Sequence, residues 1–272
     1  MELEQKYRLS LAALKDYADK AGFTDVVIGL SGGIDSSLTA LMCVEAFGAD
    51  HVHGFMLPGP YSSDHSLTDA RCLAENLGIE AQVISILEPY EGFERALVKH
   101  VGGDLRGLAS ENTQARCRMV CLMALSNNYR WMLVNTGNKS EAMMGFSTLY
   151  GDTAGAFAPL GGLYKTDVFA LSRWCNAVAL ERGQMPPIPE NVLIKPPSAE
   201  LSPGAEDEKS LGIDYATLDK ILIAYYEQGR SLDDLVAAGF DRRQATEVIA
   251  KADSYAYKRA MEPPFPQDTF YR

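Results

Sequence analysis

The stretch VVIGLSGGIDSS, residues 26–37, decides the fold that we expect. It begins with a short apolar run, Val26–Leu30, which is typical of a strand buried on both faces in a parallel sheet. The adjacent Gly32 and Gly33 then allow a tight turn, and residues 35–47 follow as a helix. The stretch therefore predicts a strand, a glycine-rich turn and a helix whose N-terminus faces an anion.

The polar residues of this turn predict a phosphate site that includes a metal ion. Adjacent glycines let several N–H groups point at one anion, and Ser31, Ser36 and Ser37 add hydroxyl donors. The carboxylate of Asp35 would repel phosphate unless a cation lies between them, which indicates Mg²⁺. The turn matches neither G-x-x-x-x-G-K-[ST] nor G-x-G-x-x-G. The alternative is a plain turn whose serine and aspartate only cap the helix.

Further along the chain, apolar runs alternate with helical patterns. Strands are predicted at 51–57, 81–87 and 131–135, and helices at 3–20, 65–77, 91–100 and 112–128. This alternation predicts an α/β fold with a parallel sheet and right-handed crossovers. Ligands of such sheets bind beyond the carboxyl ends of the strands, where the turns after Leu30 and Asn135 both lie.

The chain is expected to be a single domain over 1–272. Its parallel α/β core is predicted at about 20–180, and C-terminal helices at 213–262. Between them, 185–212 is rich in proline and acidic residues, so we predict a mobile loop there, suited to act as a lid.

Composition excludes several classes of protein. The 272 residues include 36 acidic and 25 basic side chains, a net charge of −11, which argues against a nucleic-acid partner. Apolar runs are too short to span a membrane, and the N-terminus lacks a signal-peptide pattern. The five cysteines form no C-x-x-C pair, so we expect reduced thiols in a cytoplasmic protein.

Seven segments together carry a resemblance to known enzymes. The turn SGGIDS at 31–36 resembles the pyrophosphate loop of the N-type ATP pyrophosphatases, which cleave ATP between the α- and β-phosphates and form an adenylate. Six later segments resemble NAD synthetase within that superfamily: NTQARCRM at 112–119, NTGNKSEA at 135–142, GFSTLYGD at 145–152, APL at 158–160 with Lys165-Thr166, KPPSAEL at 195–201, and YKR at 257–259. Their order and spacing match that family from about residue 10 to 262.

The resemblance implies a fold and a reaction. The fold would be the Rossmann-like, flavodoxin-like sheet of the adenine nucleotide alpha hydrolases, in a homodimer. The enzyme would be a ligase that converts ATP, deamido-NAD and ammonia into AMP, pyrophosphate and NAD, with Mg²⁺ as cofactor.

The resemblance also implies roles for individual residues. ATP contacts are expected from Gly29, Leu30, Ser31, Gly32, Gly33, Ile34, Asp35, Ser36, Thr136, Lys165 and Ser198. Deamido-NAD contacts are expected from Arg116, Ser147, Thr148, Tyr150, Gly151 and Lys258. Asp35 and Glu141 would hold Mg²⁺, while Asp35, Lys165 and Asp152 would be catalytic. Without the motif, Arg116, Glu141 and Lys258 would be ordinary surface charges.

Two departures from the pattern bear on the nitrogen donor and the dinucleotide. Leu149 and Ala156 stand where the short ammonia-dependent enzymes carry Lys and Asp. The surrounding motifs resemble instead the synthetase domain of the glutamine-dependent branch, without its glutaminase domain. We therefore expect free ammonia or a separate glutaminase as the nitrogen source. Asp152 and Asp167 are candidates for binding or deprotonating ammonium.

Two rival functions stay open from the sequence. One is another ATP pyrophosphatase, such as GMP synthetase or a tRNA-modifying synthetase, and the other is a non-catalytic adenine-nucleotide-binding module. In either case, an acidic chain that binds polyanions must do so locally. We expect the 31–36 amides, Mg²⁺ and the basic side chains of Arg116, Lys165 and Lys258 to form a positive pocket.

Overall fold

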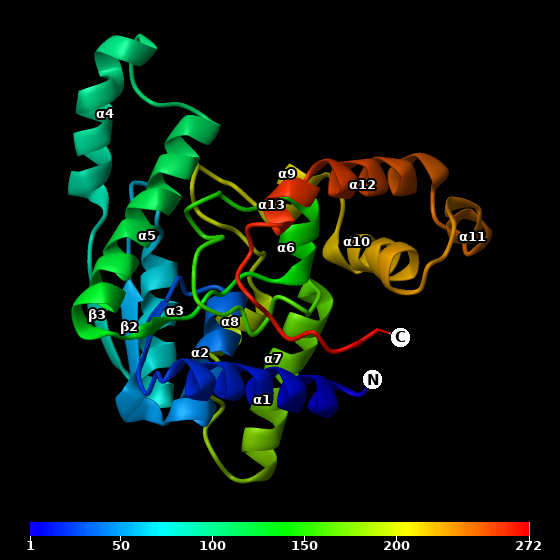
Figure 1. The fold of residues 1–272 in the computed structure, drawn as a ribbon, viewed down its shortest axis with the longest axis horizontal. Helices are drawn as coiled ribbons and strands as arrows, with labels where there is room; N and C mark the ends of the chain where they lie inside the picture. The colour runs from blue at the N-terminus through cyan, green and yellow to red at the C-terminus, as the bar shows by residue number, and fades with distance from the viewer. Residues whose placement is uncertain (272) are drawn as a thin grey trace.

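A computed structural model describes residues 1–271 and places four parallel strands in one sheet (Figure 1). The strand order is β3-β2-β1-β4. The strands are β1 (Val26–Gly29), β2 (Val52–Met56), β3 (Glu80–Val83) and β4 (Met132–Leu133). The parallel α/β fold predicted from the sequence is confirmed.

Helices cover both faces of this sheet (Figure 1). One face carries α1 (Leu3–Ala21), α2 (Ile34–Phe47), α3 (Asp64–Leu77) and α7 (Lys165–Glu181), and the other carries α4 (Leu87–Val101) and α5 (Leu108–Tyr129). Side chains of β1 alternate between the two layers, because Val26 and Ile28 join the first core and Val27 joins the second. As expected for a strand buried on both faces, all three are fully buried.

A second group of helices stands beside the sheet and has its own hydrophobic core (Figure 1). It comprises α6 (Lys139–Met144), α10 (Tyr215–Leu222) with a π-helical turn (Ile223–Glu227), α11 (Leu232–Ala237), α12 (Arg242–Ser254) and α13 (Ala256–Arg259). Leu218, Leu235 and Val248 are buried in this core. The C-terminal helices predicted at 213–262 are present, with a break at Tyr255 between α12 and α13 and an end at Arg259.

Two predicted strands are shorter than expected. The strand predicted at 81–87 ends at Val83, and Leu87 already begins α4. Since β3 lies at the sheet edge with largely exposed side chains, no buried alternation marks its end. The strand predicted at 131–135 is reduced to Met132–Leu133, with a single bridge from Val134 to Phe157 beyond it.

The segment 185–212 is not an uninterrupted loop. It contains α8 (Glu190–Ile194) and α9 (Asp207–Leu211), and side-chain hydrogen bonds attach it to α3 and α5. Its mobility stays a prediction. Within residues 1–271, no helix has the length and apolar character needed to cross a membrane.

Candidate active site

The glycine turn after β1 leaves no room for a side chain. Gly32 has φ +74°, and a Cβ placed there would lie 2.2 Å from the carbonyl oxygen of Ser66 in α3. Only glycine combines this left-handed conformation with so close an approach. The contact fixes the turn against α3 and directs residues 33–36 across the carboxyl end of the sheet.

The first turn of α2 presents free amides. Gly33 caps this helix without a side-chain hydrogen bond, and its own N–H donates to Ser31 Oγ at 3.1 Å. Ser36 Oγ and Ser37 Oγ both donate to the Gly33 carbonyl, at 3.1 and 2.8 Å. The amides that open a helix have no carbonyl to bond within it, so those of Ile34–Ser36 can receive an anion.

These residues line a cavity of about 320 Å³. Its wall includes most of the predicted ATP residues: Gly29, Leu30, Ser31, Gly33, Ile34, Asp35, Ser36, Thr136, Lys165 and Ser198. Gly32 lies behind this wall and is buried. The turns after β1 and β4 thus meet at the carboxyl ends of adjacent strands, which is where sequence reasoning placed a site.

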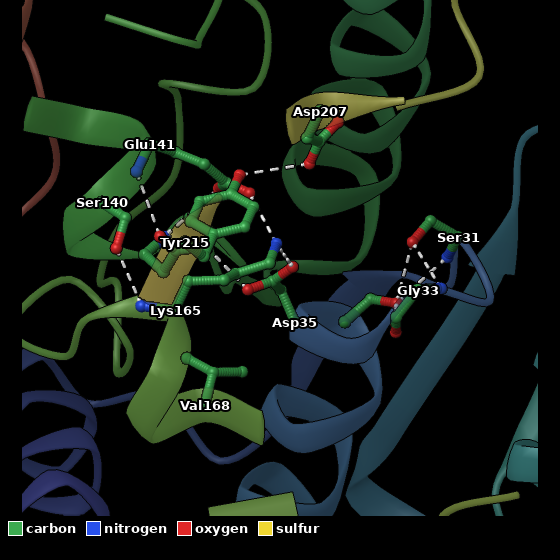
Figure 2. Close-up of polar contacts among 12 residues, drawn as sticks. Ser31, Gly33, Asp35, Ser140, Glu141, Lys165, Val168, Asp207 and Tyr215 are labelled. Atoms are coloured by element: carbon green, nitrogen blue, oxygen red, sulfur yellow. Dashed lines mark hydrogen bonds and ion pairs between the residues drawn. The ribbon is translucent and has the colours of Figure 1, made fainter. Parts of the chain in front are cut away.

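A buried lysine joins two carboxylates in this cavity (Figure 2). Lys165 Nζ lies 2.6 Å from Asp35 Oδ2 and 2.9 Å from Glu141 Oε1, and the lysine side chain is 2% exposed. Asn138 Nδ2 donates to the other oxygen of Asp35 at 2.7 Å. The three predicted charged residues therefore come from α2, α6 and α7 to one point.

The backbone beside Lys165 is held by a chain of hydrogen bonds. Its N–H donates to Ser140 Oγ at 2.8 Å (Figure 2), and that hydroxyl donates to Asp219 Oδ1 at 2.6 Å. The Thr166 N–H donates to Asp219 Oδ2 at 2.8 Å. Asp219, which is fully buried on α10, thus fixes the first turns of α6 and α7 together.

Burial and mutual repulsion raise the pKa values of carboxylates in this cavity. Burial, opposed by Lys165 and reinforced by Asp35, raises the pKa of Glu141 to about 8. Burial also raises the pKa of Asp207, whose Oδ2 accepts a hydrogen bond from Tyr215 Oη at 3.2 Å. For Lys165, burial alone would lower the pKa, but the neighbouring carboxylates outweigh it and raise that pKa. The lysine therefore stays charged and partly offsets the effect of burial on its acidic neighbours.

This donor set fits Mg²⁺ shared with a phosphate ligand. Mg²⁺ is commonly bound by one or two carboxylates, with water and phosphate oxygens completing its shell. Asp35 and Glu141 supply two carboxylates beside the α2 amides. Among residues 1–271, no cluster of three or more His, Cys, Asp or Glu side chains forms a metal cage.

The residues expected to contact deamido-NAD gather around the loop 145–152, beside the cavity. Arg116 Nε donates to the Leu149 carbonyl at 3.1 Å. Lys258 Nζ donates to the carbonyls of Gly145 and Ser147, at 2.8 and 2.6 Å. Ser147 and Asp152 line the cavity, whereas Arg116, Thr148, Tyr150, Gly151 and Lys258 are not part of its wall.

The side chains of this cavity do not by themselves form the predicted positive pocket. Its wall carries three basic residues, Arg118, Lys165 and Lys195, and six acidic ones, Asp35, Glu141, Asp152, Glu200, Asp207 and Glu262. The basic side chains of Arg116 and Lys258 instead donate hydrogen bonds to backbone carbonyls. Because an acidic wall repels a free nucleotide, it favours a nucleotide that is bound to a cation over one that is not.

Sequence reasoning missed several residues of the wall. One of them is Asn138, which forms a capping box with the predicted Glu141 at the start of α6, a pattern that N-x-x-E at 138–141 could have indicated. Glu200 accepts hydrogen bonds from Ser63 and Ser66, and so ties the 195–201 segment to the start of α3. No local sequence pattern indicated Asp207 or Glu262, because contacts between residues far apart in the sequence bring them to the cavity wall.

Asp167, the other candidate for ammonium, lies elsewhere. Its Oδ2 is 2.6 Å from Lys6 Nζ and accepts a hydrogen bond from Tyr271 Oη. It is not part of the cavity wall, whereas Asp152 is. Burial raises the pKa of the Asp152 carboxyl.

Comparison with known families identifies this arrangement. A sequence model of the NAD synthase family matches residues 7–262. The chain belongs to the NAD synthase family. The match covers the whole span that the seven segments indicated, so the resemblance seen in the sequence is confirmed.

Curated relatives of the NAD synthase family extend the comparison. The glutamine-dependent NAD(+) synthetase of Thermotoga maritima is 44% identical over 256 residues, which are 94% of this chain and 44% of that protein. The Rhodobacter capsulatus enzyme of the same name is 44% identical over 271 residues, 98% of this chain and 49% of the relative. The chain thus spans about half the length of these relatives.

Solved structures of NAD synthases and a related synthetase share the fold. A glutamine-dependent NAD+ synthetase from Acinetobacter baumannii, in complex with ADP, has a TM-score of 0.69 at 36% identity, covering 100% of this chain and 48% of that one. An NMN synthetase from Francisella tularensis has a TM-score of 0.75 at 30% identity, covering 95% and 96%. An NH3-dependent NAD synthetase from Campylobacter jejuni reaches 0.69 at 27% identity, covering 96% of both chains.

Proposed function

We propose that the chain catalyses the ATP-dependent amidation of deamido-NAD to NAD. The observation that carries this proposal is the Lys165 ammonium between Asp35 and Glu141, beside the open amides of α2. A charged lysine, two carboxylates and a helix N-terminus are the groups that a triphosphate requires when it loses pyrophosphate. A module that only binds adenine nucleotides would not need this lysine between two acids.

The proposed reaction has two steps. A nicotinate carboxylate is a poor electrophile, because its oxygen is not a viable leaving group. One carboxylate oxygen therefore attacks the α-phosphorus of ATP, the bond to the β-phosphate oxygen breaks, and pyrophosphate leaves. Ammonia then attacks the acyl carbon, AMP departs with the transferred oxygen, and loss of a proton from nitrogen gives the amide.

The chain's own residues would position and stabilise charge in these steps. The amides of residues 34–36 bind phosphate oxygens, and Lys165 Nζ stabilises the charge that develops on the departing pyrophosphate. Asp35 and Glu141 would hold Mg²⁺, which neutralises phosphate charge when bound. Asp152, on the cavity wall, would bind ammonium and take up its proton.

The first test is product analysis. The pure chain is incubated with ATP, Mg²⁺, deamido-NAD and either ammonium or glutamine. NAD, AMP and pyrophosphate should form with ammonium. Absence of NAD, or release of ADP instead of AMP, contradicts the proposal. NAD formation from glutamine only after adding a glutaminase would assign the donor to a partner.

Nicotinate mononucleotide is a second candidate substrate. Arg116 and Lys258, expected to hold the dinucleotide, bind backbone carbonyls and lie outside the cavity wall. In addition, the structure resembles an NMN synthetase from Francisella tularensis over nearly its whole length. The ratio of kcat/KM for the two substrates separates the candidates, and we expect deamido-NAD to be preferred.

We also propose a homodimer in the cytoplasm. Large apolar side chains are exposed along α4 and α5: Phe93, Leu97, Val98, Val101, Leu108, Val120 and Met123. A second copy would cover this face, to which the predicted helix at 112–128 contributes Val120 and Met123. Light scattering should give twice the 29.7 kDa chain mass, and a monomer at micromolar concentration would contradict the dimer.

A further inference from the structure

The C-terminal tail, residues 263–271, packs on the segment that leads into Lys165. The Ala158 N–H donates to the Pro264 carbonyl at 2.9 Å. A Cβ at Gly161 would lie 2.7 Å from Phe265 Cβ, and one at Gly162 would lie 2.8 Å from Phe270 Cε2. The two glycines therefore make room for the tail, which crosses from α13 toward α1 and α7 (Figure 1).

Tyr271, at the end of this tail, binds Tyr164, which precedes Lys165, and Asp167, which lies two residues after it. The N–H of Tyr164, the N-cap residue of α7, donates to Tyr271 Oη at 2.9 Å. The same hydroxyl donates to the Asp167 carboxylate. The rings of Tyr164 and Tyr271 also meet edge to face, with centroids 5.0 Å apart.

Lys6 of α1 closes this cluster from the other end of the chain. Its Nζ lies 2.6 Å from Asp167 Oδ2 and 4.1 Å from the centroid of the Tyr271 ring. The Lys6 side chain is only 8% exposed. The first turn of α7 is thus held by α1 and by the tail, on top of its attachment to Asp219 through Thr166.

We propose that Tyr271 is a positioning residue, which holds the first turn of α7 so that Lys165 Nζ stays between Asp35 and Glu141. This inference rests on the proposed function, in which that ammonium stabilises departing pyrophosphate. The tail contacts the residues on either side of Lys165 and leaves its side chain free for the cavity. Loss of the hydroxyl leaves the Tyr164 N–H without its acceptor and Asp167 with Lys6 alone, so the turn loosens.

The test compares Tyr271→Phe with a matched control, Tyr226→Phe. Tyr226 Oη also donates to a carboxylate, Asp253 Oδ1 at 2.7 Å, but this carboxylate lies on α12 and not on α7. Two readouts are used: amide hydrogen exchange of residues 158–168 without substrates, and kcat per active site, with sites counted from a pyrophosphate burst. A merely structural role would lower the number of active sites and leave kcat per site unchanged.

Tyr271→Phe should speed exchange in 158–168 about tenfold and lower kcat per site about tenfold, with KM for deamido-NAD within twofold. The control should change neither readout. Unchanged exchange or unchanged kcat per site in Tyr271→Phe, or equal changes in the control, overturns the inference. If the wild-type chain forms no NAD, the proposed function fails, and faster exchange confined to Tyr271→Phe still supports the tether.

Discussion

At the scale of single residues, Lys165 sets the balance of charge in the site. Its ammonium contacts two carboxylates that would otherwise repel each other in a crowded, poorly solvated place. Removing one partner of a buried charged cluster costs most when the charge left behind has no compensation. Loss of the Lys165 charge and loss of the Asp35 charge should therefore change the free energy of unfolding by different amounts.

Lys165→Met should lower the free energy of unfolding by about 3 kcal/mol, because Asp35 and Glu141 then face each other without a cation. Asp35→Asn should cost only about 1 kcal/mol, since Lys165 keeps Glu141 as its partner. Both should lower kcat at least about 100-fold, as loss of charge stabilisation does elsewhere. Urea unfolding and steady-state kinetics measure these effects. Full activity in Asp35→Asn would remove this residue from phosphate and metal binding.

Glu262 predicts a pH dependence of stability. Burial, with a contribution from Asp152, raises the pKa of its carboxyl from 4.5 to about 7. The folded chain then binds this proton more tightly than the unfolded chain, so the free energy of unfolding falls as pH rises from about 4.5 through 7. Glu262→Gln should remove this loss and be about 3 kcal/mol more stable than wild type at pH 8.

The difference in free energy of unfolding between Glu262→Gln and wild type should become smaller toward pH 5. Thermal or urea unfolding at a series of pH values measures it. A gap that is constant between pH 5 and 8 would show that the carboxyl titrates normally.

At the scale of elements, the turn between β1 and α2 depends on its contact with α3. Gly32→Ala adds a methyl group that meets the Ser66 carbonyl, besides the strain of φ +74°. The matched control is Gly22→Ala, where φ is +76° but nothing lies within 4 Å. In both variants the alanine must adopt a left-handed conformation, which costs about 1 kcal/mol. Only in Gly32→Ala must neighbouring backbone atoms also move.

Gly32→Ala should therefore be at least about 2 kcal/mol less stable than Gly22→Ala, and should bind ATP more weakly. Denaturant unfolding and calorimetric titration with ATP and Mg²⁺ provide the comparison. Equal stability and equal ATP affinity in the two variants would show that the turn adapts and that its close approach to α3 is not required.

Elements that are continuous in sequence were predictable, and those assembled over distance were not. The strand, turn and helix at 26–47 follow from local pattern, since one short stretch contains the apolar run, the glycines and the helix start. Lys165 meets Asp35 across 130 residues, and only the family resemblance indicated that pair. Asp219 and Tyr271 reach the same helix turn from α10 and the tail, which no spacing in the sequence indicates.

At the scale of the whole molecule, an acidic chain is proposed to bind two polyanions. Its net charge is −11, and the cavity wall is itself rich in carboxylates. Long-range attraction therefore opposes a free nucleotide, and binding must come from the α2 amides, Lys165 and an accompanying cation. This arrangement favours the ATP–Mg²⁺ complex over free ATP as the species that binds.

The proposed acyl-adenylate is tested most directly by following one oxygen atom. Deamido-NAD labelled with ¹⁸O in its nicotinate carboxylate is converted with ATP, Mg²⁺ and ammonium, and the products are analysed by mass spectrometry. If the carboxylate attacks the α-phosphorus, one ¹⁸O atom appears in AMP for each NAD formed, and none appears in pyrophosphate. Label in pyrophosphate or free phosphate, or NAD formed without label in AMP, would contradict the account.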